Sequence, residues 1–211
     1  MAHQYWGSSI GLHRKEIAWS LIGLGMQMDQ HYAAANNLDH GGFKKSMDWF
    51  YYEAQRRGFN TALAQPVENA LKSPAPWSSG WNMSLMHGKA NFICWMLQDL
   101  LGSEKFTRII KRIIREKAGT VMQNKELIRF VREAFGEDID WFVADWIDGG
   151  ATLDYAVTNV QKDGKGWRVT VAQLGSGAFP VLVEAQTESG NKLPCCIRGC
   201  GLSVNATAGA E

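Results

Sequence analysis

The sequence predicts a mainly α-helical fold, a multi-helix bundle of the right-handed type, followed by a few antiparallel β-strands. Through most of residues 16–148, apolar residues recur three and four positions apart, which is the spacing of one helix face. The Gly149-Gly150 pair ends this pattern. Beyond it, short runs rich in β-branched and aromatic residues alternate with turn residues. We therefore expect a helical domain over 1–150 and the start of a β-sandwich-like domain over 151–188.

The first predicted helix spans residues 16–35. Its apolar face consists of Ile17, Leu21, Leu24, Met28 and Tyr32. A second helix over 43–57 is expected to end at Gly58, because glycine readily adopts the left-handed conformation found after a helix C-terminus. Residues 60–81 contain three of the five prolines and are expected to form a loop that lines a cleft.

A strongly apolar helix is predicted over 82–101, where Gly102 stops it. Ser103 is expected to cap the next helix through its side chain. The buried stripe of that helix consists of Phe106, Ile109, Ile110, Ile113 and Ile114. Its other face is rich in Lys and Arg, which favours a solvated surface over a phosphate site. Two more helices are predicted over 124–135 and 138–148.

The predicted strands cover three short segments, 155–160, 167–172 and 180–185. Turn residues separate them, among them the Asp163-Gly164 pair. Three strands cannot close a sandwich, so the β-domain is expected to be incomplete. From 189 to 211 the sequence loses its periodicity, and this tail is expected to be irregular or disordered.

The composition argues against two classes of partner. The formal net charge is only +1, so no strong overall field attracts nucleic acid or an anionic membrane. No segment approaches the roughly 20 apolar residues that a membrane-spanning helix needs, and the first residues do not resemble a signal peptide.

Cys195, Cys196 and Cys200 lack a C-x-x-C pair and a nearby His, so neither a metal site nor a cellular compartment follows from them. The localisation therefore stays unknown.

Residues 3–7, His-Gln-Tyr-Trp-Gly, resemble the end of the zinc-binding helix of gluzincin aminopeptidases, the family of membrane alanyl aminopeptidase and leukotriene hydrolase. In that family an H-E-x-x-H motif precedes Gln, two aromatic residues and Gly. The two His bind zinc, and the Glu is the general base for the zinc-bound water. The resemblance implies that His3 is the second zinc ligand. The first His and the Glu would then be encoded just upstream of Met1.

The third zinc ligand of the family is a Glu, nineteen residues after the second His, in a pattern of Trp, two residues, Glu and Gly. Here Trp19 and Gly23 match this pattern, but the ligand position holds Ile22. An aliphatic side chain offers zinc no lone pair. The resemblance thus implies a degenerate metal site in which, of the family's ligands, this chain carries only His3.

The family also carries a Tyr that helps to stabilise the oxyanion of the tetrahedral intermediate, two residues before a Lys. Lys89 matches that Lys, but the Tyr position holds His87. A neutral imidazole can donate a hydrogen bond, so His87 is either a partial replacement or a sign of a drifted site. His3 and His87 together would offer only a weak, adventitious metal site. The resemblance extends over roughly residues 1–188.

The resemblance implies the C-terminal part of a thermolysin-like catalytic domain, with release of N-terminal amino acids from peptides as the family activity and zinc as its cofactor. We expect this chain to bind no zinc by itself and to be an inactive, partial relative. The alternative is a non-catalytic peptide- or protein-interaction module that retains the cleft, with Trp77 and Trp81 as contact surface. Apolar surface left by a missing part of the domain would also favour self-association. A reading frame that starts at an internal Met is a third possibility.

Overall fold

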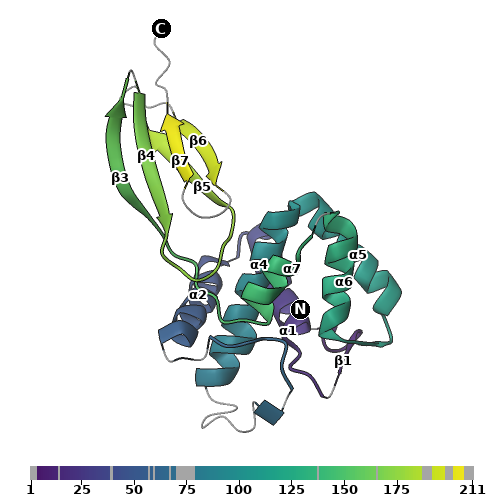
Figure 1. Ribbon diagram of the computed structural model, residues 1–211. Coiled ribbons are helices and arrows are strands. Elements are labelled where there is room, and N and C mark those ends of the chain that lie inside the picture. Colours follow the sequence, from purple (N-terminus) through teal and green to yellow (C-terminus); the bar gives the residue numbers. More distant parts are fainter. Residues whose placement is uncertain are drawn as a thin grey trace. The chain divides into compact units, whose positions relative to one another are not determined.

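The structure, a computed structural model, describes residues 4–13, 15–38, 40–56, 58, 60–66, 68–69, 79–136, 138–164, 166–186, 192–197 and 202–206. The chain divides into two compact units, Met1–Gly150 and Ala151–Glu211. The first is built mainly of helices and the second of strands (Figure 1). The broad fold class predicted from the sequence, mainly helical with antiparallel strands, is confirmed.

Among its described residues, the helical unit contains six helices of more than ten residues and several short elements. In chain order these are β1 (Gly11–Leu12), α1 (Trp19–Ala35), α2 (His40–Arg56), the π-helix η2 (Ser79–Lys89), α4 (Ala90–Leu101), α5 (Ser103–Lys117), β2 (Val121–Met122), α6 (Asn124–Phe135), α7 (Asp140–Phe142) and the π-helix η3 (Val143–Ile147). Strands β1 and β2 pair in parallel, which fastens the N-terminal segment to the connection between α5 and α6. None of the described helices has the length and apolar character that crossing a bilayer requires.

Large aromatic side chains fill the core of the helical unit. Its most completely buried residues include Trp6, Trp19, Trp146, Phe106, Phe130 and Phe142. The predicted buried stripe of α5 is confirmed for Phe106, Ile109, Ile110 and Ile113. Burial of each such side chain stabilises the fold by roughly 1.5–3 kcal/mol, so this core is the main source of stability.

Two glycines allow the helices that hold the candidate site to pack at backbone distance. A Cβ atom placed on Gly23 of α1 would lie 2.5 Å from the carbonyl oxygen of Ala90 in α4. One placed on Gly88 of η2 would lie 2.5 Å from the backbone nitrogen of Tyr51 in α2. Such distances exclude any side chain. Helix α1, helix α2 and the junction of η2 with α4 therefore meet at these two glycines.

Asn124 links the start of α6 to the start of α1 through buried hydrogen bonds. Its Oδ1 accepts from the Ser20 hydroxyl at 2.8 Å, and its Nδ2 donates to the Ile17 carbonyl oxygen at 2.6 Å. Its backbone N–H donates to Glu16 Oε2 at 3.0 Å. Asn124 is only 8% exposed, so water cannot readily replace these bonds.

Substitution of Asn124 by Ala is therefore expected to lower the free energy of unfolding by about 2–4 kcal/mol, because it removes the buried hydrogen bonds of this side chain to the Ser20 hydroxyl and to the Ile17 carbonyl oxygen. Urea denaturation of both proteins measures the difference. Asn69→Ala is the matched control, since Asn69 forms an exposed bond to Gln65. An Asn124→Ala protein as stable as the Asn69→Ala protein would contradict this assignment.

Several predicted boundaries differ from the structure. Helix α1 begins at Trp19 rather than at residue 16, because Glu16 bridges to Pro66 and the Ile17 N–H donates to Gln65 O at 3.4 Å. The single helix predicted over 82–101 is η2 followed by α4, and η2 already begins at Ser79, inside the predicted loop. Apolar spacing does not distinguish π- from α-helical hydrogen bonding.

The predicted side-chain cap by Ser103 is wrong. Gly102 occupies the cap position with φ 78° and ψ 146°, and no side chain caps the helix. The Ser103 hydroxyl instead accepts a hydrogen bond from Gln98 Nε2 at 3.2 Å. This hydrogen bond links Ser103 at the start of α5 to Gln98 in α4, so the hydroxyl contributes to the contact between the two helices.

The β-unit contains two antiparallel sheets. One has the order β3 (Tyr155–Asp163), β4 (Gly166–Gln173), β7 (Leu202–Ala206), and the other pairs β5 (Val181–Gln186) with β6 (Lys192–Ile197). The predicted turn at Asp163-Gly164 joins β3 to β4, with Gly164 at φ 61°.

The expectation of an irregular tail over 189–211 is corrected by strands β6 and β7. Strand β6 pairs with β5, where Ile197 lies opposite Val181. Strand β7 pairs with β4, where Leu202 lies opposite Val171. Strand formation depends on such distant pairing partners, which local composition does not reveal. Cys195 and Cys196 lie in β6, whereas Cys200 lies outside the described residues.

Candidate functional site

Ile22 lies in the first turn of α1, where the family resemblance implies the third zinc ligand. Its backbone N–H donates to the Ala18 carbonyl oxygen at 3.0 Å. Its side chain is half-buried, and the neighbouring Leu21 and Gly23 are buried. The position is thus held firmly by the helix and remains partly open to solvent, but its side chain has no atom that can bind a metal.

His87 lies near the end of η2 and is half-buried. It directly precedes Gly88, which packs against the backbone of α2. Because Gly23 contacts Ala90 at the helix crossing, the structure brings the chain segments that hold Ile22 and His87 together. A π-helix is often found at functional sites, since its wider turn redirects side chains. His3, the third predicted site residue, lies outside the described residues.

Lys89, the other residue of this motif, is completely buried. Its ammonium donates to the carbonyl oxygens of Thr61 at 2.7 Å and Gly149 at 2.8 Å. These bonds hold the 60–64 segment and the end of the helical unit against η2. Burial lowers the pKa of Lys89 to about 8. Its position predicts a structural role in positioning the segment next to His87.

The depressed pKa of Lys89 predicts a pH dependence of stability. In the unfolded chain this lysine titrates near 10.5, so between pH 8 and 10.5 the unfolded state binds more protons. Stability therefore rises with pH across this window. Relative to Lys89→Met, the free energy of unfolding is expected to increase by about 2–3 kcal/mol from pH 7 to pH 10. Urea denaturation at several pH values measures it, and parallel profiles for the two proteins would contradict the shift.

Two further histidines, His13 and His31, have structural partners. His13 Nδ1 lies 3.7 Å from Glu16 Oε1, and His31 packs on the Trp95 ring and bonds to Gln98 Oε1 at 2.9 Å. Within the described residues there is no group of three or more His, Cys, Asp or Glu that could hold a metal ion. With Ile22 in place of a carboxylate, the described donor set does not fit a zinc site.

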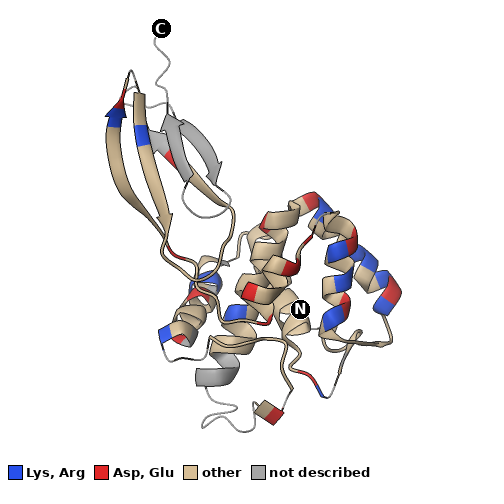
Figure 2. Ribbon diagram, in the orientation of Figure 1, with Lys and Arg blue, Asp and Glu red and all other residues tan. Residues whose placement is uncertain are grey.

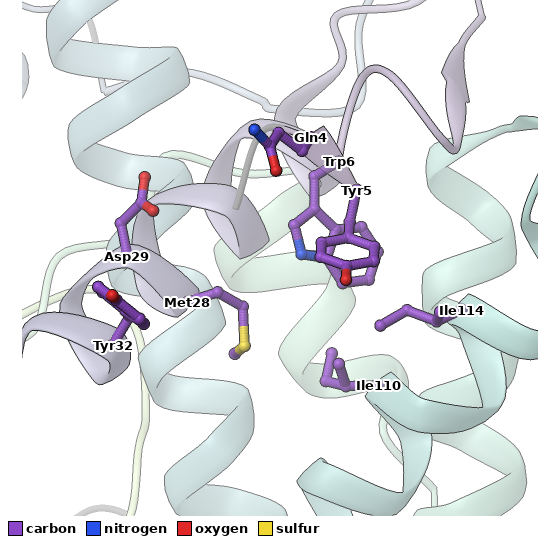
Figure 3. Close-up of a pocket in the computed structure, with 8 residues that line it drawn as sticks. All are labelled: Gln4, Tyr5, Trp6, Met28, Asp29, Tyr32, Ile110 and Ile114. Atoms are coloured by element: carbon purple, nitrogen blue, oxygen red, sulfur yellow. The ribbon is translucent and has the colours of Figure 1, made fainter. Parts of the chain in front are cut away.

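A pocket of about 370 Å³ lies elsewhere in the helical unit (Figure 3). Its lining comes from the N-terminal segment, the last two turns of α1 and the middle of α5, and consists of Gln4, Tyr5, Trp6, Met28, Asp29, Tyr32, Ile110 and Ile114. Neither Ile22 nor His87 lines it. Met28 and Tyr32 belong to the apolar face predicted for this helix, and Tyr32 is 44% exposed. The pocket forms where three segments that are distant in the sequence come together in the fold.

Helix α5 contains Lys and Arg residues interleaved with Glu, and Figure 2 shows residues of both charges along α5 and α6. Arg112 pairs with Glu116 at 2.7 Å and with Glu133 at 2.6 Å. Arg108 pairs with Glu104, and Lys117 pairs with Glu126. These pairs neutralise much of the positive charge, in keeping with a solvated helix surface.

Comparison with known proteins finds two kinds of relative, a protease-interacting factor and an aminopeptidase, whereas no family model matches. The chain is 25% identical over 133 residues to the Tricorn protease-interacting factor F2 of Thermoplasma acidophilum, covering 60% of this chain and 16% of that protein. It is 23% identical over 176 residues to the leucyl aminopeptidase of Saccharolobus solfataricus, covering 82% and 21%. The chain thus spans about a fifth of the length of these relatives.

Among solved structures, aminopeptidase A of Legionella pneumophila, determined in complex with aspartic acid, has a similar fold. The match has a TM-score of 0.62 and 14% sequence identity, and it covers 97% of this chain and 23% of that protein. The likeness to aminopeptidases predicted from the sequence is confirmed.

Proposed function

We propose, from its relationship to aminopeptidases, that this chain is a catalytically degenerate relative of the zinc-dependent gluzincin enzymes. The helical unit would correspond to the C-terminal part of a thermolysin-like catalytic domain, and the β-unit to the start of a sandwich-like domain. The relatives' names support a peptidase origin. We infer the loss of activity from Ile22, which occupies the position of the family's third zinc ligand.

The chemistry of zinc hydrolases explains why this position matters. A catalytic zinc needs three protein ligands and an open position for water. Ile22 contributes no donor atom, and His87 replaces the Tyr that helps to stabilise the oxyanion in the family. Peptides remain the expected ligand class, because the family releases amino acids from peptide N-termini. We assign no step of hydrolysis to the residues of this chain.

Zinc content and peptidase activity test this proposal together. After dialysis against buffer with micromolar zinc, we expect well below one equivalent of zinc by atomic absorption. We also expect no release of fluorophore from leucyl or alanyl amides above the buffer rate. A preparation that retains one equivalent of zinc and cleaves these amides would overturn the proposal.

A second function, a non-catalytic interaction module, is favoured by an exposed aromatic pair on α2. Trp49 and Tyr52 are 57% and 53% exposed, with ring centroids 5.5 Å apart. Exposed aromatic clusters are typical of contact surfaces. The pair is also a candidate surface for self-association, which the double variant Trp49→Ser, Tyr52→Ser tests by sedimentation. The predicted contact residue Trp77 lies outside the described residues, as does the side chain of Trp81.

A further inference from the structure

The pocket between the N-terminal segment, α1 and α5 has the size of a small-molecule site. Its volume of about 370 Å³ falls in the range of roughly 300–1,000 Å³ that is typical of such sites. Figure 3 shows Met28 on one helix and Ile110 and Ile114 on another, with the ring of Tyr5 between them. Three separate chain segments therefore contribute to one concave surface.

The walls of this pocket are apolar and partly aromatic. Trp6 and Ile110 are 2% and 6% exposed, so the surrounding core fixes their positions. Met28 and Ile114 are half-buried, and a flexible Met side chain adapts to the shape of a ring. Aromatic rings also attract one another beyond the simple burial of apolar area. With one Trp and two Tyr in the lining, the walls favour a ligand that contains an aromatic ring.

Three uncharged polar side chains border the pocket. Tyr5 and Tyr32 are 54% and 44% exposed, and Gln4 is exposed as well, so their polar groups are accessible to a ligand. A phenol hydroxyl both donates and accepts hydrogen bonds, and the Gln amide does so too. Asp29, the one charged residue of the lining, already interacts within the protein.

The hydrogen-bonding groups that remain for a ligand are therefore neutral groups that donate and accept. An amide is complementary to such groups, because its N–H donates and its carbonyl oxygen accepts. A neutral amide also loses less hydration than an ion when it enters an apolar pocket. The lining thus favours an amide over a charged group beside the ring.

We propose that this pocket binds an aromatic ring with an adjacent amide group, the chemistry of a phenylalanine residue within a peptide. The ring lies against the apolar wall that includes Trp6, Met28 and Ile114. The amide forms hydrogen bonds with the hydroxyl groups of Tyr5 and Tyr32 that border the pocket. This binding is reversible and requires neither zinc nor hydrolysis, so its test is independent of the zinc and peptidase assays.

Three probes separate the contributions of the ring and the amide. N-acetylphenylalaninamide has both, N-acetylalaninamide lacks the ring, and toluene lacks the amide. Two-dimensional NMR titration of the full chain at pH 7 measures each affinity. We expect the first probe to bind at least about tenfold more tightly than the second, because the ring removes a large apolar area from water. It should bind about fivefold more tightly than toluene, since one net hydrogen bond contributes about that factor.

A longer probe identifies the source of the ligand. In the peptide N-acetyl-Ala-Phe-Ala-amide, the ring and its amides lie within a chain. An affinity at least equal to that of N-acetylphenylalaninamide would assign the pocket to a side chain of a peptide. Loss of binding on this extension would assign it to a free small molecule with the same chemistry.

Variants of the lining locate the site. The double variant Tyr5→Phe, Tyr32→Phe keeps both rings and removes both hydroxyls. It should weaken the binding of N-acetylphenylalaninamide about fivefold or more and leave that of toluene unchanged. Tyr52→Phe is the matched control, because Tyr52 lies on α2 and is 53% exposed. Ile114→Trp should fill the pocket and abolish the binding of both probes.

Several results would overturn the proposal. One is an affinity for N-acetylphenylalaninamide no higher than that for N-acetylalaninamide, and another is no detectable binding at millimolar concentration. An equal loss of affinity in Tyr52→Phe and in the double Tyr variant would also contradict it, as would ring binding that persists in a folded Ile114→Trp protein. The double Tyr variant decides the test by itself if the bulkier substitution prevents folding.

Discussion

Replacement of Ile22 by Glu is expected to raise the zinc affinity of this chain by at least about ten- to a hundredfold, because the loss of even an outer-shell partner of a metal ligand changes the affinity by that much. The position is half-buried in the first turn of α1, so a carboxylate placed there can reach solvent and ions. This first turn contains no acidic residue, and a negative charge near a helix N-terminus is favourable. The substitution should therefore supply a ligand at little cost in stability. Competition with a chromophoric zinc chelator measures the affinity.

Two matched variants show whether the gain comes from coordination. Ile22→Gln has the shape of Ile22→Glu without its charge and is expected to leave the affinity near that of the natural chain. His3→Ala in the Ile22→Glu background should cancel the gain, because the resemblance implies that residues 3 and 22 share the metal. A double-mutant cycle measures this coupling. If Gln acts like Glu, or if the gain survives without His3, the proposed alignment with the zinc site is wrong.

Helix α6 illustrates what the sequence alone could establish. Its predicted bounds, 124–135, agree with the structure because all its signals are local. Gln123 and Glu126 form a capping box, and Gly136 at φ 77° ends the helix. The start of α1 was missed for the opposite reason. There the Ile17 N–H donates to the carbonyl oxygen of Gln65, almost fifty residues away. The first helical turn that periodicity predicted therefore does not form.

The candidate site likewise has one part that the sequence predicts and another that it does not. The pattern of Trp19 and Gly23 around Ile22 could be read from the sequence, and Gly23 does lie at the crossing with Ala90. The pocket could not be predicted, because its lining joins residues 4–6, 28–32 and 110–114. No local pattern relates these segments. Tyr32 belongs to the apolar face that periodicity predicts for α1, and the structure leaves it partly exposed at the pocket.

Gly23→Val is expected to lower the free energy of unfolding by about 3 kcal/mol or more. Its Cβ would lie 2.5 Å from the carbonyl oxygen and 2.8 Å from the carbonyl carbon of Ala90, and 2.9 Å from Cys94 Sγ. Two of these atoms are backbone of α4, so a change of side-chain rotamer cannot relieve the overlap. Overpacking of a tight contact typically costs about 1–3 kcal/mol, and a backbone clash is at the upper end. Urea denaturation measures the loss.

Gly41→Val provides the same chemical change where no such crossing constrains it. Gly41 is exposed near the start of α2, and valine is a somewhat better helix former than glycine there. Its stability should stay within about 0.5 kcal/mol of the natural chain. A Gly23→Val protein as stable as this control would mean that α1 and α4 do not approach at residue 23. The segments that hold Ile22 and His87 would then no longer be neighbours, since it is this contact that brings them together.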